Sequence, residues 1–184
     1  PIKGTRSRNS DHKLDKMVVD ELYNCPKDRA EHLMIVDLLR NDLGKICKYD
    51  SINVKDLFNV ESYKTIHHMV TKIQGTLRDQ INISDIISAL FPGGSITGAP
   101  KERAIEIIDL LESNNRNIYT GTIGHVSSNK EMYFNIAIRT LVVDNKIGQY
   151  CVGGGIVWDS DPILEWEEAN IKSNILTNLI LKEV

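Results

Sequence analysis

Three strand-like runs follow one another in the segment IYTGTIGHVSSNKEMYFNIAIRTLVVDNKIGQYCVGGGIV, residues 118–157. The runs cover residues 118–127, 131–143 and 147–157, and turn-like residues such as Asn129 and Asn145 separate them. Links this short join antiparallel neighbours, because a parallel connection needs a crossover of a dozen or more residues. The segment therefore predicts antiparallel strands in this part of the chain.

Helices are predicted on both sides of these strands. The first covers residues 27–43, with Asp28 near its start and Gly44 placed to end it. The other predicted elements are a strand over residues 64–73, a short helix that Ser84 could cap, and helices over residues 100–112 and 161–181. Since this order lacks the regular β-α-β alternation of a parallel sheet, the predicted fold class is α+β.

The composition is that of an ordinary globular domain. The chain has 184 residues, 41% hydrophobic and 26% charged, which is enough for one domain with a sizeable core. The formal net charge is −3, and acidic and basic residues are interspersed. We therefore expect neither a nucleic-acid-binding stripe nor a polybasic membrane patch.

Cysteine usage and apolar runs bear on localisation. Cys25, Cys47 and Cys151 are odd in number and lack a C-x-x-C spacing, which predicts reduced thiols in the cytoplasm. No apolar run approaches the ~20 residues of a membrane helix, and we expect no signal peptide. The sequence opens on Pro1 without an initiator methionine, so we expect a piece of a longer protein.

Two glycine-rich loops, residues 93–101 and 153–155, are candidates for ligand contact. The first lacks the G-x-x-x-x-G-K-[ST] spacing of a phosphate-binding loop, and the second lacks G-x-G-x-x-G at a helix start. A nucleotide site is therefore disfavoured. Each loop is either a backbone able to approach a ligand closely or simply a tight turn.

Helix-borne charges suggest a second kind of site. Glu168 and Lys172 are four residues apart, which is either a solvated salt bridge or the lip of a crevice. Glu31 shares a predicted helix face with Ile35 and Leu38. Glu31 and Glu168 could together hold a Mg²⁺ ion, although spacing alone gives no distance between them.

Arg139 falls on a polar strand face with Tyr133 and Asn135, which either meets solvent or lines a cleft. On a cleft, its guanidinium would clamp a carboxylate. From the residues alone, His68 is most simply a structural histidine and Lys3 a surface lysine.

Five motifs together resemble the chorismate-utilising enzymes in order and spacing, over essentially the whole chain. They are PIKGTR (residues 1–6), DRAEHLMIVDLLRND (28–42), FPGGSITGAPK (91–101), IRT (138–140) and GGGIV (153–157). The resemblance implies a two-sheet α/β sandwich with antiparallel strands and helices packed outside. Residues 1–184 would be the C-terminal part of its chorismate-binding domain, with the N-terminal portion absent.

Lys3 points to the aminodeoxychorismate synthase branch, because anthranilate synthases typically carry Ala at this position. The resemblance implies that Lys3 attacks C2 of chorismate as the C4 hydroxyl leaves. Ammonia, supplied from glutamine by an amidotransferase subunit or domain, then gives 4-amino-4-deoxychorismate for para-aminobenzoate and folate synthesis. The alternatives are anthranilate synthase component I and a non-catalytic fragment that retains the site residues. A homo-oligomer is possible.

The same resemblance assigns roles to individual residues. Glu31 and Glu168, with Glu165 as a weaker candidate, match the family's Mg²⁺ ligands. His68 matches the histidine near the departing hydroxyl. The positions that match substrate-binding residues are Tyr119 and Arg139 on the enolpyruvyl carboxylate, and Thr97, Gly98, Gly154 and Lys172 on the ring-carboxylate side.

Overall fold

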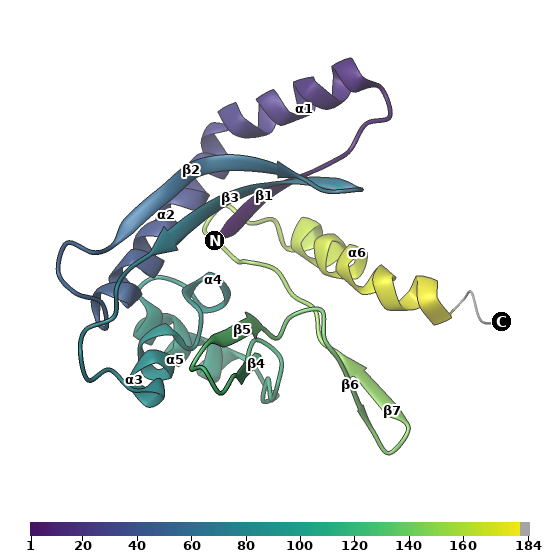
Figure 1. Ribbon diagram of the computed structural model, residues 1–184. Coiled ribbons are helices and arrows are strands. Elements are labelled where there is room, and N and C mark those ends of the chain that lie inside the picture. Colours follow the sequence, from purple (N-terminus) through teal and green to yellow (C-terminus); the bar gives the residue numbers. More distant parts are fainter. Residues whose placement is uncertain (181–184) are drawn as a thin grey trace. The chain divides into compact units, whose positions relative to one another are not determined.

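The computed structural model describes residues 1–180 (Figure 1). The chain divides into two compact units, Pro1–Asp109 and Leu110–Val184. Each unit combines helices with antiparallel strands, so the predicted α+β class is confirmed. Within residues 1–180, no helix has both the length and the apolar content that crossing a membrane requires.

The first unit contains a three-stranded antiparallel sheet in the order β1-β3-β2. Its strands are β1 (Ile2–Ser7), β2 (Asn53–Ser62) and β3 (Ile66–Gln74). The unit also contains α1 (His12–Asn24), α2 (Pro26–Gly44), α3 (Ile83–Leu90), α4 (Gly94–Thr97) and the greater part of α5 (Lys101–Leu111). Figure 1 shows α1 and α2 beside the sheet, against which both pack.

Strand β3 shows why the sheet buries one face. His67, Met69 and Thr71 are buried, whereas the residues between them are partly exposed, as period-2 alternation requires. Met69 packs with Leu22 of α1 and Phe58 of β2 to form the core cluster of this sheet. The predicted strand 64–73 is therefore confirmed to within two residues.

A buried polar network joins α1 to the sheet. The Asp15 carboxylate accepts hydrogen bonds from Arg8 and from the backbone of Asn9, and its Oδ1 lies 2.9 Å from His67 Nε2. These hydrogen bonds, that of Arg8 first, hold the pKa of the Asp15 carboxyl well below its usual range. The carboxylate therefore stays ionised while most of it is removed from water.

Helix ends follow local capping chemistry. Pro26 occupies the first turn of α2, where a missing N–H costs nothing. At α3, the Asn82 side chain accepts from Asp85 N, and the Asp85 carboxylate accepts from Asn82 N. The cap is therefore Asn82, and the prediction that Ser84 caps this helix was wrong, because Ser84 lies inside its first turn.

The second unit contains two β-hairpins and a long helix. Strands β4 (Thr122–Val126) and β5 (Met132–Ile136) pair antiparallel, as do β6 (Leu141–Asp144) and β7 (Ile147–Tyr150). Helix α6 covers Pro162–Ile180, and its predicted end at Leu181 lies outside the described residues.

The predicted continuous strand over residues 131–143 was wrong. The chain leaves β5 after Ile136, and Ala137 is fully buried. Arg139 has a φ of 49°, a left-handed conformation outside the β region, so regular strand geometry is broken at this residue. The third predicted strand also ends early, at Tyr150 rather than Val157.

Candidate active site

Lys3 and Glu31 form an ion pair between β1 and α2. Lys3 Nζ lies 2.6 Å from Glu31 Oε1, and the two side chains are 24% and 38% exposed. The pairing of β1 with β3 shifts register between Lys3 and Thr5, a bulge of the kind that redirects a side chain. A sequence separation of 28 residues thus becomes a direct contact at the sheet edge.

Gly4 makes this bulge possible. Its φ is +72°, which strains residues with a Cβ, and a Cβ there would lie 2.8 Å from Leu22 Cδ1. Only a residue without a side chain lets β1 pass this close to α1. The glycine next to Lys3 therefore sets the path of the strand that carries it.

His68 lies on β3 opposite Thr5. The Thr5 hydroxyl is 2.9 Å from His68 Nδ1, and the Tyr63 ring contacts the imidazole edge-on. His68 therefore attaches to the same short strand as Lys3, which brings the two predicted catalytic residues onto neighbouring strands.

Sequence reasoning missed His32, next to Glu31 on α2. Its side chain is fully buried, and its Nε2 lies 2.7 Å from Thr71 Oγ1 of β3. Burial, helped by the positive charges of the amino terminus and Lys3, lowers the pKa of His32 to about 4. A neutral imidazole thus anchors α2 to the sheet beside Glu31. The only indication of His32 in the sequence was its place in the motif of residues 28–42.

Thr97 and Gly98 lie in the loop between α3 and α5. Thr97 Oγ1 donates to Gly93 O at 3.1 Å, which closes the short helix α4. Gly98 has a φ of 147°, in the range that favours glycine. Residues 93–98 therefore form a tight turn, and the alternative that this backbone approaches a ligand stays a prediction.

The second unit brings together five of the predicted site residues, which are Tyr119, Gly154, Glu165, Glu168 and Lys172. Lys172 Nζ donates to Gly153 O at 3.0 Å and lies 2.5 Å from Glu168 Oε1. A Cβ on Gly154 would lie 2.8 Å from Glu165 Oε2 and 3.9 Å from Glu168 Oε1. The loop therefore lies against the face of α6 that carries these carboxylates, and Glu165 approaches it more closely than Glu168.

Tyr119 also approaches this loop. Its hydroxyl would lie 2.9 Å from a Cβ on Gly153, and burial raises its pKa above the usual value. The hydroxyl is thus a protonated hydrogen-bond donor at neutral pH. Arg139, by contrast, is exposed and has no hydrogen bond or ion pair with any described residue. Arg139 lies beyond the end of β5, so it does not share the strand face of Tyr133 and Asn135 on which it was predicted.

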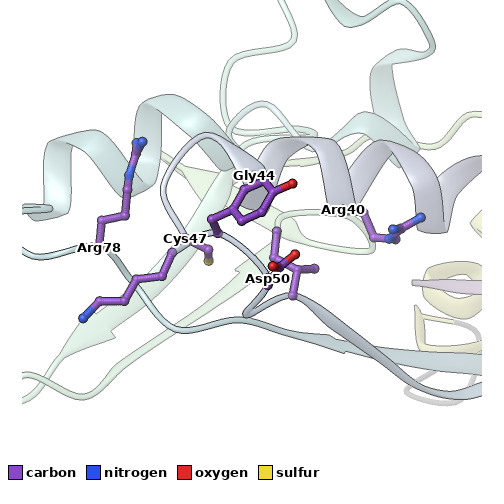
Figure 2. Close-up of a pocket in the computed structure, with 8 residues that line it drawn as sticks. Arg40, Gly44, Cys47, Asp50 and Arg78 are labelled. Atoms are coloured by element: carbon purple, nitrogen blue, oxygen red, sulfur yellow. The ribbon is translucent and has the colours of Figure 1, made fainter.

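A pocket of about 390 Å³ lies elsewhere, at the C-terminal end of α2 (Figure 2). Its lining includes Arg40, Lys48 and Arg78. These cations already have partners, because Arg40 pairs with Asp37, Lys48 pairs with Asp79, and Arg78 donates to the Lys45 carbonyl. None of the predicted site residues lines this pocket.

The chain is similar to known proteins along almost its whole length. A family model described as chorismate binding enzyme matches residues 1–178. Aminodeoxychorismate synthase component 1 of Escherichia coli (strain K12) is 48% identical over 100% of this chain and 40% of that protein. Anthranilate synthase component 1 of Saccharolobus solfataricus is 43% identical over 98% of this chain and 43% of that protein.

A solved structure has the same fold. The crystal structure of anthranilate synthase component I from Streptococcus pneumoniae TIGR4 matches with a TM-score of 0.80 and 34% identity, over 90% of this chain and 40% of that one. The chain thus spans about two fifths of the length of each of these relatives. The resemblance predicted from the five motifs is confirmed, and the chain belongs to the chorismate binding enzyme family.

Proposed function

We propose that residues 1–184 are the C-terminal part of the chorismate-binding domain of an aminodeoxychorismate synthase. The complete protein would convert chorismate and ammonia, released from glutamine by an amidotransferase partner, to 4-amino-4-deoxychorismate. Family membership and 48% identity to the Escherichia coli component 1 support this assignment. The observation that carries it is the Lys3 amine, which a bulged strand directs to Glu31 on α2.

In the proposed reaction, Lys3 Nζ forms a bond to C2 of chorismate as the C4 hydroxyl leaves, and the ring double bond shifts between them. Overall the amine loses one proton and the departing hydroxyl gains one, so a molecule of water is released. Ammonia then bonds to C4 and expels the Lys3 amine, which restores the enzyme. The amine must be neutral to attack, so Lys3 must first lose the proton that it carries in its ion pair with Glu31.

His68 is suited to assist the departing hydroxyl. If the Thr5 hydroxyl donates to Nδ1, the neutral imidazole carries its proton on Nε2. That proton is then available to the leaving oxygen as the C4–O bond breaks. Thr5 thereby sets the tautomer that this role requires.

Among residues 1–180, no three acidic, histidine or cysteine side chains lie close enough together to hold a metal ion, so the proposed Mg²⁺ site rests on the chemistry of its donors. Glu165 and Glu168 present carboxylate oxygens along one loop, and oxygen ligands are those that Mg²⁺ prefers. We propose Glu31, Glu168 and Glu165 as its ligands. When bound, the ion would neutralise the ring carboxylate of chorismate.

The remaining residues would bind the substrate's two carboxylates. Lys172 and the backbone of Gly154 would meet the ring carboxylate, together with Thr97 and Gly98. Lys172 is held by Glu168 and Gly153 O, so its ammonium is already oriented along this loop. Tyr119, as a protonated hydroxyl, and Arg139 would bind the enolpyruvyl carboxylate.

Anthranilate synthase component I is the second candidate, favoured by 43% identity to the Saccharolobus solfataricus protein. The two reactions consume the same substrate and differ in product. The complete polypeptide, given chorismate, Mg²⁺ and ammonium, should accumulate 4-amino-4-deoxychorismate. Anthranilate as the main product would establish the second candidate, and no product from folded protein would leave a non-catalytic remnant. Adding the amidotransferase partner with glutamine in place of ammonium tests the ammonia source.

A further inference from the structure

An ion pair outside the proposed catalytic groups lies at the far end of α2. Lys101 Nζ is 2.6 Å from Asp42 Oδ2, and the two side chains are 12% and 1% exposed. The other carboxylate oxygen of Asp42 accepts from Lys45, the C-cap residue of α2, at 3.0 Å. Both carboxylate oxygens are therefore satisfied, one locally and one by the first residue of α5.

The Asp42–Lys101 pair is far more buried than the other charged pair of α5. Arg103 and Glu106 of α5 also lie 2.7 Å apart, but they are 68% and 64% exposed. A pair in water contributes little. A buried pair costs desolvation that an apolar pair of similar volume would avoid, so stability alone does not account for it. What it supplies is a directional link between two elements.

The link joins the loop of residues 93–100 to α2. At the start of this loop, Gly94 lies so close to Leu38 of α2 that a Cβ there would clash with the leucine side chain. At its end, Lys101 meets Asp42. Leu38 and Asp42 are four residues apart on one face of the helix, so both ends of the loop contact the same stripe.

Helix α2 also carries Glu31 on that face. Glu31 and Asp42 are eleven residues apart, or about 16 Å along a rigid helix. His32 anchors the Glu31 end of α2 to the sheet. A loop attached to this helix at two points is therefore held at a set distance from Glu31.

We propose that Asp42 and Lys101 are a positioning pair, which holds the Thr97–Gly98 backbone in place for the ring carboxylate of chorismate. The proposal rests on the proposed function. Neither residue contacts the substrate; both act through the loop. Without the link the loop would still form, but it would sample positions that bind the carboxylate poorly.

The test uses the complete polypeptide with the double substitution Asp42→Asn and Lys101→Met, which removes both charges together. The matched control is Arg103→Met with Glu106→Gln, which removes an exposed pair from the same helix. Hydrogen–deuterium exchange of the amides of residues 94–99 is measured first. Exchange in the double variant should be about tenfold faster there and unchanged in α2 and β3. The control should match the wild type throughout.

Kinetics then separate positioning from general damage. The KM for chorismate should rise about tenfold, while kcat falls less than threefold. Unchanged exchange in the loop, faster exchange throughout the unit, or a lower kcat with unaltered KM would each overturn the proposal. If the double variant does not fold, Asp42→Asn alone, which keeps a neutral acceptor for Lys101, is read by the same criteria.

The exchange and activity measurements test the positioning pair and the proposed function separately. Hydrogen exchange needs no turnover, so it tests the link even if the wild type makes no 4-amino-4-deoxychorismate. A loop loosened in the variant, together with a wild type that binds chorismate but makes another product, sinks the proposed function and retains the positioning pair. Unchanged exchange in the loop of the double variant, together with a wild type that makes 4-amino-4-deoxychorismate, refutes the positioning pair and retains the proposed function.

Discussion

His32 should make the protein less stable as the pH falls from about 6.5 to about 4. Its native pKa is lowered to about 4 by burial, against about 6.5 in the unfolded chain. Between these values the unfolded chain binds a proton that the native state excludes, so protonation favours unfolding. The difference of about 2.5 units corresponds to about 3 kcal/mol, present in full above pH 6.5 and lost progressively below it.

The assay compares urea unfolding of the wild type with that of His32→Leu between pH 4 and 8. The substitution replaces the titrating imidazole by an apolar side chain of similar size. The difference in unfolding free energy between wild type and variant should therefore change by about 3 kcal/mol between pH 8 and pH 4. His125→Gln, at an exposed histidine, is the control and should show no such change. A native His32 pKa near 6.5, read from exchange of its C2 hydrogen, would refute the reasoning.

Other substitutions give independent tests of the site. Gly4→Ala should destabilise the protein by about 2–4 kcal/mol, from the left-handed φ and the contact with Leu22, as measured by urea unfolding; a loss below 0.5 kcal/mol, about the size of an ordinary surface change, would contradict the role of the bulge. Glu31→Gln should weaken Mg²⁺ binding about 10- to 100-fold by calorimetry, and unchanged affinity would remove Glu31 from the ligand set. Glu165→Gln should also weaken Mg²⁺ binding. A change in thermal stability with unchanged Mg²⁺ affinity would give Glu165 a structural role instead.

Much of the fold follows from local patterns. The strand around Met69 is predictable because its alternation has period two throughout. Strand β2 escaped prediction because its register shifts between Lys55 and Asn59, where Asp56 and Phe58 have positive φ. A strand broken in this way loses the alternation by which it would be recognised.

Helix α1 also escaped prediction, although its sequence carried a signal. Asp11 caps it, and Leu14, Val18 and Leu22 recur every four residues. The break at Arg139 had no such signal, because a non-glycine residue with positive φ is not marked by its sequence.

The candidate site also contains contacts that local spacing predicts and contacts that only tertiary packing creates. The Glu168–Lys172 pair follows from helical spacing, and the structure forms it. The Lys3–Glu31 contact joins positions 28 residues apart, so it depends on how β1 packs against α2. Glu31 was a candidate from its helix face, whereas Lys3 was singled out only through the family resemblance, which carries tertiary information that spacing lacks.

The central claim is that Lys3 is a nucleophile, and trapping its adduct tests that claim most directly. The complete polypeptide is incubated with chorismate and Mg²⁺ without ammonia, quenched, digested and examined by mass spectrometry. The account predicts a chorismate skeleton, less one water, on the peptide that contains Lys3, and no adduct in Lys3→Ala. An active enzyme that forms 4-amino-4-deoxychorismate with Lys3 unmodified throughout, or at an undiminished rate in Lys3→Ala, would contradict it.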